Sequence, residues 1–129
     1  MSDSDQRPGF RAHEDSLRLP FDELTTRLRH SLGVRLVGLI GNVTTASEVS
    51  SWADGHSTPG DAVQERLRCA YQVTELLRDR YDAVTVQTWF KGRNASLDDV
   101  APAQLLREGD PTEAGRKVLA AATDFAYIG

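Results

Sequence analysis

With 129 residues, the chain is long enough for one domain or two very small ones, and its 40% hydrophobic residues suffice to bury a core. The formal charge is -4 and neither half is basic, which counts against a strong phosphate-binding surface on the monomer. The single cysteine excludes an intrachain disulfide, and no early apolar run resembles a signal peptide or a bilayer-spanning segment. We therefore expect a soluble, cytoplasmic protein.

The chain begins with a polar segment and then changes to a helical pattern. Residues 1–19 carry charges of both signs and contain almost nothing to bury, which predicts a disordered tail. Apolar residues then recur at helical spacing between Phe21 and Leu32, and Gly33 can end this helix.

Two further short helices are expected before the longest helical pattern. Residues 34–40 are too apolar for a surface and too few to stand alone, and periodicity does not distinguish a helix from a strand there. Their place between two helical patterns favours a short buried helix. Residues 41–42 supply a turn, after which Thr44 or Thr45 can cap a helix that runs to Asp54.

The longest helical pattern, residues 58–81, is expected to organise the rest of the chain. Thr58 can accept hydrogen bonds from the first turn, and Pro59 fits at the first helical position. At 1.5 Å per residue this helix would be about 35 Å long, so it can contact two neighbours. The residues of its predicted apolar face are Val63, Leu67, Ala70, Thr74, Leu77 and Tyr81.

The two ends of this long helix are predicted to serve different halves of the chain. We expect Val63 and Leu67 to contact the first helices and Tyr81 to contact the C-terminal helices. Ala70 and Thr74 at its centre are small, which favours close approach of another helix. The centre is therefore the predicted contact with a second copy of the chain.

The second half of the chain also predicts helices. Asp82 can cap the segment 83–90, which is rich in β-forming residues, but a lone strand would leave its backbone groups unpaired. A loop rich in turn formers, residues 91–99, follows it. Pro102 begins a short helix, and residues 110–111 begin the last one. The predicted fold class is all-α.

A short helix, a glycine-containing turn and a second helix form the outline of a helix-turn-helix. The second helix ends in Val49, Trp52 and Gly55, and here the sequence resembles the Xre type, whose recognition helix commonly ends in Val-x-x-Trp-x-x-Gly. Its solvent side carries no Lys or Arg, whereas specific readout usually depends on Arg, Lys, Asn or Gln. A shape kept only for packing, with little DNA affinity, is therefore the alternative. The candidate DNA-binding residues are Arg35, Thr44, Thr45, Ser47, Ser50 and Ser51, with Arg27 and Arg29 as further cations nearby.

A second pattern lies in the C-terminal half and consists of Trp89-Phe90, Asn94, Leu97, Pro102, Leu105-Leu106 and Gly109. Together with the Xre-like part, it resembles the C-terminal toxin-binding domain of the MbcA/ParS/Xre family of antitoxins, over roughly residues 20–126. Members share a Trp-(Leu/Phe), Asn, Leu, Pro, Leu-Leu, Gly signature in this order, and they pair with RES-domain toxins, which inactivate cells by consuming NAD.

The resemblance implies a division of labour along the chain. Residues 20–81 would form the helix-turn-helix module with the long linking helix, and residues 82–129 the toxin-binding domain. The C-terminal helices would dock on such a toxin and close its NAD pocket, and the helix-turn-helix would repress the protein's own operon as a homodimer. The alternatives are an autonomous transcriptional repressor without a toxin partner and a small structural or adaptor domain.

The candidate toxin-binding residues are Phe90, Asn94, Asp98, Leu106, Phe125, Tyr127, Ile128 and Gly129. Adjacent residues on a helix point about 100° apart, so we expect one member of each pair in Trp89-Phe90 and Leu105-Leu106 to remain available to a partner. Trp89 is the expected core member. The aromatic C-terminal end is either an interface anchor or a frayed terminus. The acidic pair 98–99 either contacts a basic partner or only solvates a loop.

An enzymatic function has little support. His13, His30 and His56 lie in a tail, on a helix and in a turn, and none is spaced from Cys69 or a carboxylate as metal ligands are. Cys69 falls within the apolar face of the long helix, which favours a buried structural thiol. No glycine-rich phosphate loop is present in the sequence. We therefore expect no reaction, no metal and no cofactor.

Overall fold

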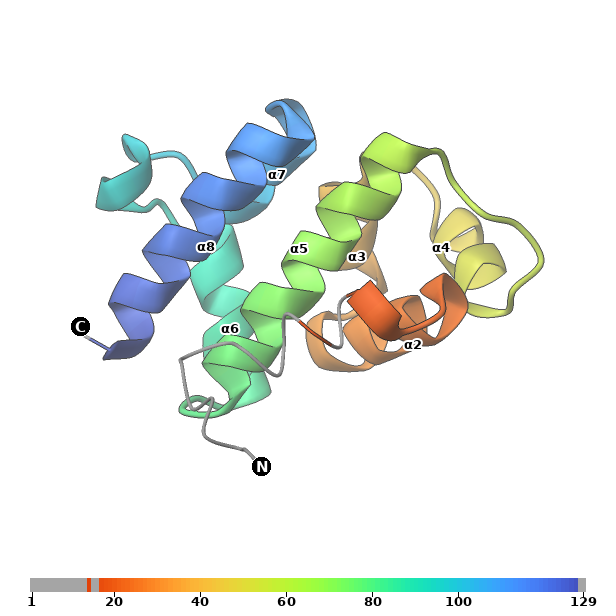
Figure 1. The fold of residues 1–129 in the computed structure, drawn as a ribbon, viewed down its shortest axis with the longest axis horizontal. Helices are drawn as coiled ribbons and strands as arrows, with labels where there is room; N and C mark the ends of the chain where they lie inside the picture. Colours follow the sequence, from red (N-terminus) through yellow and green to blue (C-terminus); the bar gives the residue numbers. More distant parts are fainter. Residues whose placement is uncertain (1–13, 15–16, 128–129) are drawn as a thin grey trace.

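A computed structural model describes residue 14 and residues 17–127 of the chain. Over this part the fold is all-helical and has no β-strand, which confirms the predicted fold class (Figure 1). The tail predicted for residues 1–19 lies outside the described residues, apart from residue 14 and residues 17–19. The helices are α2 (Phe21–Leu32), α3 (Val34–Gly41), α4 (Ala46–Ala53), α5 (Asp61–Arg78), α6 (Ala83–Lys91), the short 3-10 helix η1 (Ala95–Leu97), α7 (Pro102–Glu108) and α8 (Pro111–Tyr127).

The first three helices form where the sequence predicts them, but Thr45, at the predicted cap position of α4, makes no capping hydrogen bond with its side chain. Helix α2 ends at Gly33, whose φ of 87° is a conformation that glycine adopts without steric cost. Helix α4 buries Val49 and Trp52 and is followed by Gly55 at a φ of 77°. Gly41 faces the Trp52 ring so closely that an added Cβ would lie 3.3 Å from it. Helices α3 and α4 are thus closely packed through a glycine.

Helix α5 is shorter than predicted, and the expected cap is wrong. It begins at Asp61, and the residue before it, Gly60, is extended at φ -68° and ψ 173°. Because the backbone is not yet helical there, Thr58 lies outside the first turn. The Pro59 carbonyl instead accepts a hydrogen bond from Gln64 Nε2 at 3.0 Å.

Helix α5 crosses the middle of the molecule, with α2, α3 and α4 on one side and α6, α7 and α8 on the other (Figure 1). The predicted contacts of Val63 and Tyr81 are confirmed. Val63 Cγ1 would lie 3.6 Å from a Cβ added at Gly41 of α3. Beyond the other end, the Tyr81 ring lies 4.9 Å from the ring of Phe125 in α8.

The centre of α5 does not offer a dimer contact, so that prediction is wrong. Ala70 and Thr74 are completely buried inside their own chain. The helix that approaches closely is α8, which packs along α5 through Gly115. A Cβ added at Gly115 would lie only 3.3 Å from Cys69 Sγ.

The two predicted modules share one hydrophobic core. Helix α3 packs on α7, and α2 packs on α6. Hydrogen bonds join the same helices: Arg107 Nη1 donates to the Leu39 carbonyl at 3.0 Å, and Gln87 Nε2 donates to the Ser31 carbonyl at 2.9 Å. The predicted boundary after Tyr81 therefore does not coincide with a break in packing.

Candidate functional site

The first candidate surface is the exposed side of α4 and the turn before it. Thr44, Thr45 and Ser47 are exposed, as is Arg35 at the start of α3. Arg35, Thr44 and Thr45 line one small hollow of about 140 Å³ between α3 and α4. The structure therefore brings together candidate residues from α3 and from the turn that precedes α4.

The remaining two candidates on α4 are half-buried and already bonded. Arg29 Nη1 donates to Ser50 Oγ at 3.3 Å, and the hydroxyls of Ser51 and Ser57 lie 2.8 Å apart. The bond from Arg29 places this α2 guanidinium against the side of α4. Arg27, by contrast, is directed away, because it bonds the Tyr71 hydroxyl and the Glu23 carboxylate.

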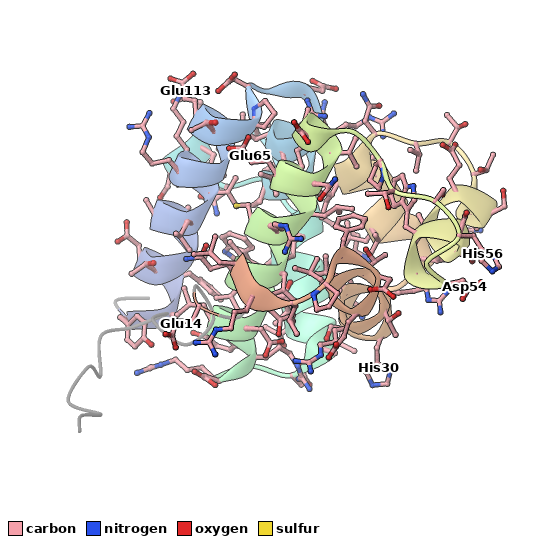
Figure 2. All side chains as sticks on the ribbon, turned by 45° about the vertical axis from the view of Figure 1, so that its right-hand side comes forward. Glu14, His30, Asp54, His56, Glu65 and Glu113 are labelled. Atoms are coloured by element: carbon pink, nitrogen blue, oxygen red, sulfur yellow. The ribbon has the colours of Figure 1, made fainter. Side chains whose placement is uncertain are left out.

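The charges around α4 are unusual for a DNA-binding helix. Residues 36–65 include no Lys or Arg and four acidic residues, so cations reach α4 only from other helices. Asp54 and His56 lie together beyond the end of α4 (Figure 2). Arg29 and Arg35 are therefore the cations best placed to contact a phosphate beside this helix.

The second candidate surface was predicted around the C-terminal signature, and two of its residues need correction. Phe90 and Leu106 are both 0% exposed, so neither side chain can contact a docking partner. Trp89 is buried as well, because α6 is covered by α2, α5 and α7. In the Leu105-Leu106 pair the half-buried member is Leu105, the reverse of the prediction.

Asn94 and Asp98 belong to the turn around η1. The side chain of Asn94 accepts a hydrogen bond from the Ser96 amide at 2.9 Å, and its carbonyl accepts one from the Asp99 amide. Asn94 thus holds the turn together. Asp98 and Asp99 have positive φ angles of 57° and 65°. Both residues are exposed, so the Asp98 carboxylate faces solvent.

The last turn of α8 lies on a cluster that we call the aromatic end: Arg80, Tyr81, Trp89, Phe125 and Tyr127. The Phe125 ring lies 4.9 Å from Tyr81 and 6.3 Å from Trp89, and the Tyr81 hydroxyl donates to the Phe125 carbonyl at 3.3 Å. Tyr127 is 42% exposed, and the Arg80 guanidinium lies 4.7 Å from the centre of its ring. The predicted contacts Ile128 and Gly129 lie outside the described residues.

Sequence reasoning missed Arg80, because a cation–π contact between residues so far apart in the chain leaves no local pattern.

Sequence reasoning also missed a groove of about 500 Å³ between α5 and α8. Near this groove Glu65 accepts a hydrogen bond from the Thr112 hydroxyl at 2.6 Å, and Glu65 and Glu113 point to the same end of the molecule (Figure 2).

Cys69 lines the same groove and is partly buried, whereas a buried thiol was predicted. Burial, and secondarily the nearby Glu65 carboxylate, raises the pKa of Cys69 to about 12. Its Sγ donates to the Gly115 carbonyl at 3.4 Å. The thiol therefore stays protonated at neutral pH, which is unsuitable for a nucleophile.

Within the described part of the chain, no cluster of three or more His, Cys, Asp or Glu side chains could hold a metal ion. No helix in the same part is long and apolar enough to cross a membrane. No family model, curated protein or solved structure matches this chain.

Proposed function

We propose that this chain is the antitoxin of a type II toxin–antitoxin pair and that it binds a RES-type NAD-degrading toxin and blocks its NAD pocket. The signature from Trp89 to Gly109 motivates the proposal. The observation that carries it is the aromatic end, where the last turn of α8 contains both the exposed Tyr127 and the packed Phe125. Because such a toxin consumes NAD, the proposal places both proteins in the cytoplasm.

The geometry of the aromatic end favours an interface anchor over a frayed terminus. Tyr127 is still within α8, and Arg80 holds its ring from one side. In the same turn of α8, the Phe125 ring packs against Tyr81 and Trp89. An aromatic ring that is already oriented loses little conformational entropy on binding, and tyrosine and arginine are enriched among the residues that dominate interface energies.

The proposed mechanism is steric and requires no reaction by this chain. The end of α8 and the residues after it would cover the entrance of the toxin's NAD pocket, so that NAD and the antitoxin compete. The concentration of free toxin would then depend on the dissociation constant of the complex. Asp98, exposed on the η1 turn, can add a contact to a basic residue of the toxin.

Inhibition of NAD consumption tests this proposal. The first step is to establish that the gene beside this one encodes a RES-type protein, and the assay then compares Tyr127→Ala with Leu39→Ala against that protein. Leu39 is a matched control because it is 39% exposed, nearly the same as Tyr127, but lies on α3. Loss of an anchor residue of this kind weakens binding by about 30-fold or more.

We expect this loss for Tyr127→Ala and unchanged inhibition for Leu39→Ala. Unchanged inhibition by Tyr127→Ala would refute the role of the aromatic end. If the wild-type chain itself leaves NAD consumption unaffected, the antitoxin proposal is wrong.

The exposed hydroxyl side chains at the start of α4 and in the turn before it favour a second activity, repression of the operon through DNA binding. Because few cations lie near α4, useful affinity requires two half-sites and therefore a homodimer. We expect Arg35→Ala to reduce the slope of log affinity against log salt by about 1 per protomer. A wild type that binds DNA but no toxin would instead be the autonomous repressor, and one without salt-dependent binding would retain α4 only for packing.

A further inference from the structure

Glu48 is the only charged residue in α4. It lies in the first turn of this helix and is exposed. The hydroxyl of Thr45 donates a hydrogen bond to its Oε1 at 3.4 Å. This contact holds one side of the carboxylate, and the exposed remainder keeps its capacity to accept hydrogen bonds from a ligand.

The side chains around Glu48 favour a nucleic acid over a protein as the ligand of this surface. Thr44, Thr45 and Ser47 are short and polar, so α4 can approach a base-pair edge closely. Among the described residues, the large apolar side chains that are exposed are Leu17, Leu39, Val84 and Tyr127, and none of them is on α4. The surface thus lacks the aromatic or aliphatic anchor on which a protein interface usually depends.

Resting on the proposed operator binding, we infer that Glu48 determines sequence specificity by accepting a hydrogen bond from the N4 amino group of a cytosine. An ionised carboxylate offers acceptors only. Guanine and thymine present acceptor atoms in the major groove, which repel it, and adenine pairs its N6 donor with the N7 acceptor. Cytosine presents a donor alone, so it is the base that a carboxylate fits best.

The two arginines beside α4 provide the positive charge for phosphate contacts, which Glu48 cannot provide. Arg29 lies against Ser50, and Arg35 lines the hollow shared with Thr44 and Thr45. They can contact the phosphates that flank the base pair and offset the repulsion between the carboxylate and the DNA backbone. Affinity would come from the arginines and base preference from Glu48.

Selection from a pool of DNA duplexes with a randomised central segment tests this inference on the full chain. The wild type is expected to enrich a cytosine at one position of each half-site, with a preference of about 5- to 100-fold over the other bases. Glu48→Gln is expected to shift the preference at that position to adenine, because an amide offers the donor and acceptor that match N6 and N7. Glu48→Ala is expected to accept all four bases there.

Asp54→Asn is the matched control, since it removes the same charge at the other end of α4. It should retain the cytosine preference, and circular dichroism establishes that each variant is folded. An unchanged motif for Glu48→Gln and Glu48→Ala would overturn the inference and leave operator binding intact. A shift of the motif by Asp54→Asn would also overturn it, because charge alone would then explain the effect. No enrichment by the wild type would overturn both the inference and the proposed repression.

Discussion

The close packing of α4 on α3 through Gly41 gives a sharp test of the fold around the first candidate surface. A Cβ added at Gly41 would lie 3.3 Å from Trp52 Cζ3 and 3.4 Å from Cη2. The Trp52 ring is rigid and buried, so it cannot move aside without displacing α4. Overpacking of this kind costs about 1 to 3 kcal/mol. The better helix propensity of alanine recovers about 0.5 to 1 kcal/mol.

We therefore expect Gly41→Ala to lower the free energy of unfolding by about 1 kcal/mol. Gly38→Ala is the control in the same helix. Its added Cβ would be 3.7 Å from the nearest side-chain atoms, which is an ordinary contact distance. This variant should gain the propensity term alone, about 0.5 to 1 kcal/mol of stability.

Urea unfolding followed by tryptophan fluorescence measures both variants, since one of the two tryptophans is Trp52 itself. The opposite signs of the two effects are the essential result. If Gly41→Ala were as stabilising as Gly38→Ala, α3 and α4 would be further apart than described, and the arrangement of the candidate surface would be wrong.

Three other predictions concern single side chains. The Thr85 amide donates a hydrogen bond to Asp82 and lowers the pKa of that carboxyl. Asp82 therefore contributes stability above its unfolded-state pKa, and this stability is lost as the pH falls through its folded-state pKa. The difference in melting temperature between wild type and Asp82→Asn should shrink on acidification, and a constant difference would contradict the cap. The pKa of Cys69 is raised to about 12, so this thiol should resist thiol reagents at neutral pH in the folded protein and react after unfolding. Rapid reaction of the native chain would show that α8 does not cover it. Thr74 Oγ1 is buried without a hydrogen-bond partner in the described structure. Thr74→Val should therefore raise the free energy of unfolding by about 1 kcal/mol. A loss of stability would indicate that this hydroxyl has a partner.

Local signals explain which parts of the fold were predictable. Asp82 caps α6 as expected because a cap depends on a residue and the amides directly after it. The helical state of α6 followed from the lack of any partner strand, against its β-forming composition. The cap predicted at Thr58 was wrong although threonine has the right chemistry for a cap. Gly60 is extended, so the helix begins only at Asp61.

The surfaces were harder to predict because burial depends on helices that are distant in sequence. Phe90 and Leu106 look equally suited to core or interface, and only the packing of α2 and α3 on the C-terminal helices decides that both are core. The contact between Arg80 and Tyr127 and the approach of Gly115 to Cys69 are equally non-local. A periodic pattern identifies a buried face but not the element that covers it.

An antitoxin of this kind must stop the NAD consumption of its toxin partner. The decisive measurement is the rate of NAD consumption by the RES-type toxin that the proposal requires, as the full chain is added in increasing amounts. We expect the rate to fall to the background once the chain is in excess, and the two proteins to co-purify. An unchanged rate in the presence of excess folded chain would contradict the antitoxin proposal.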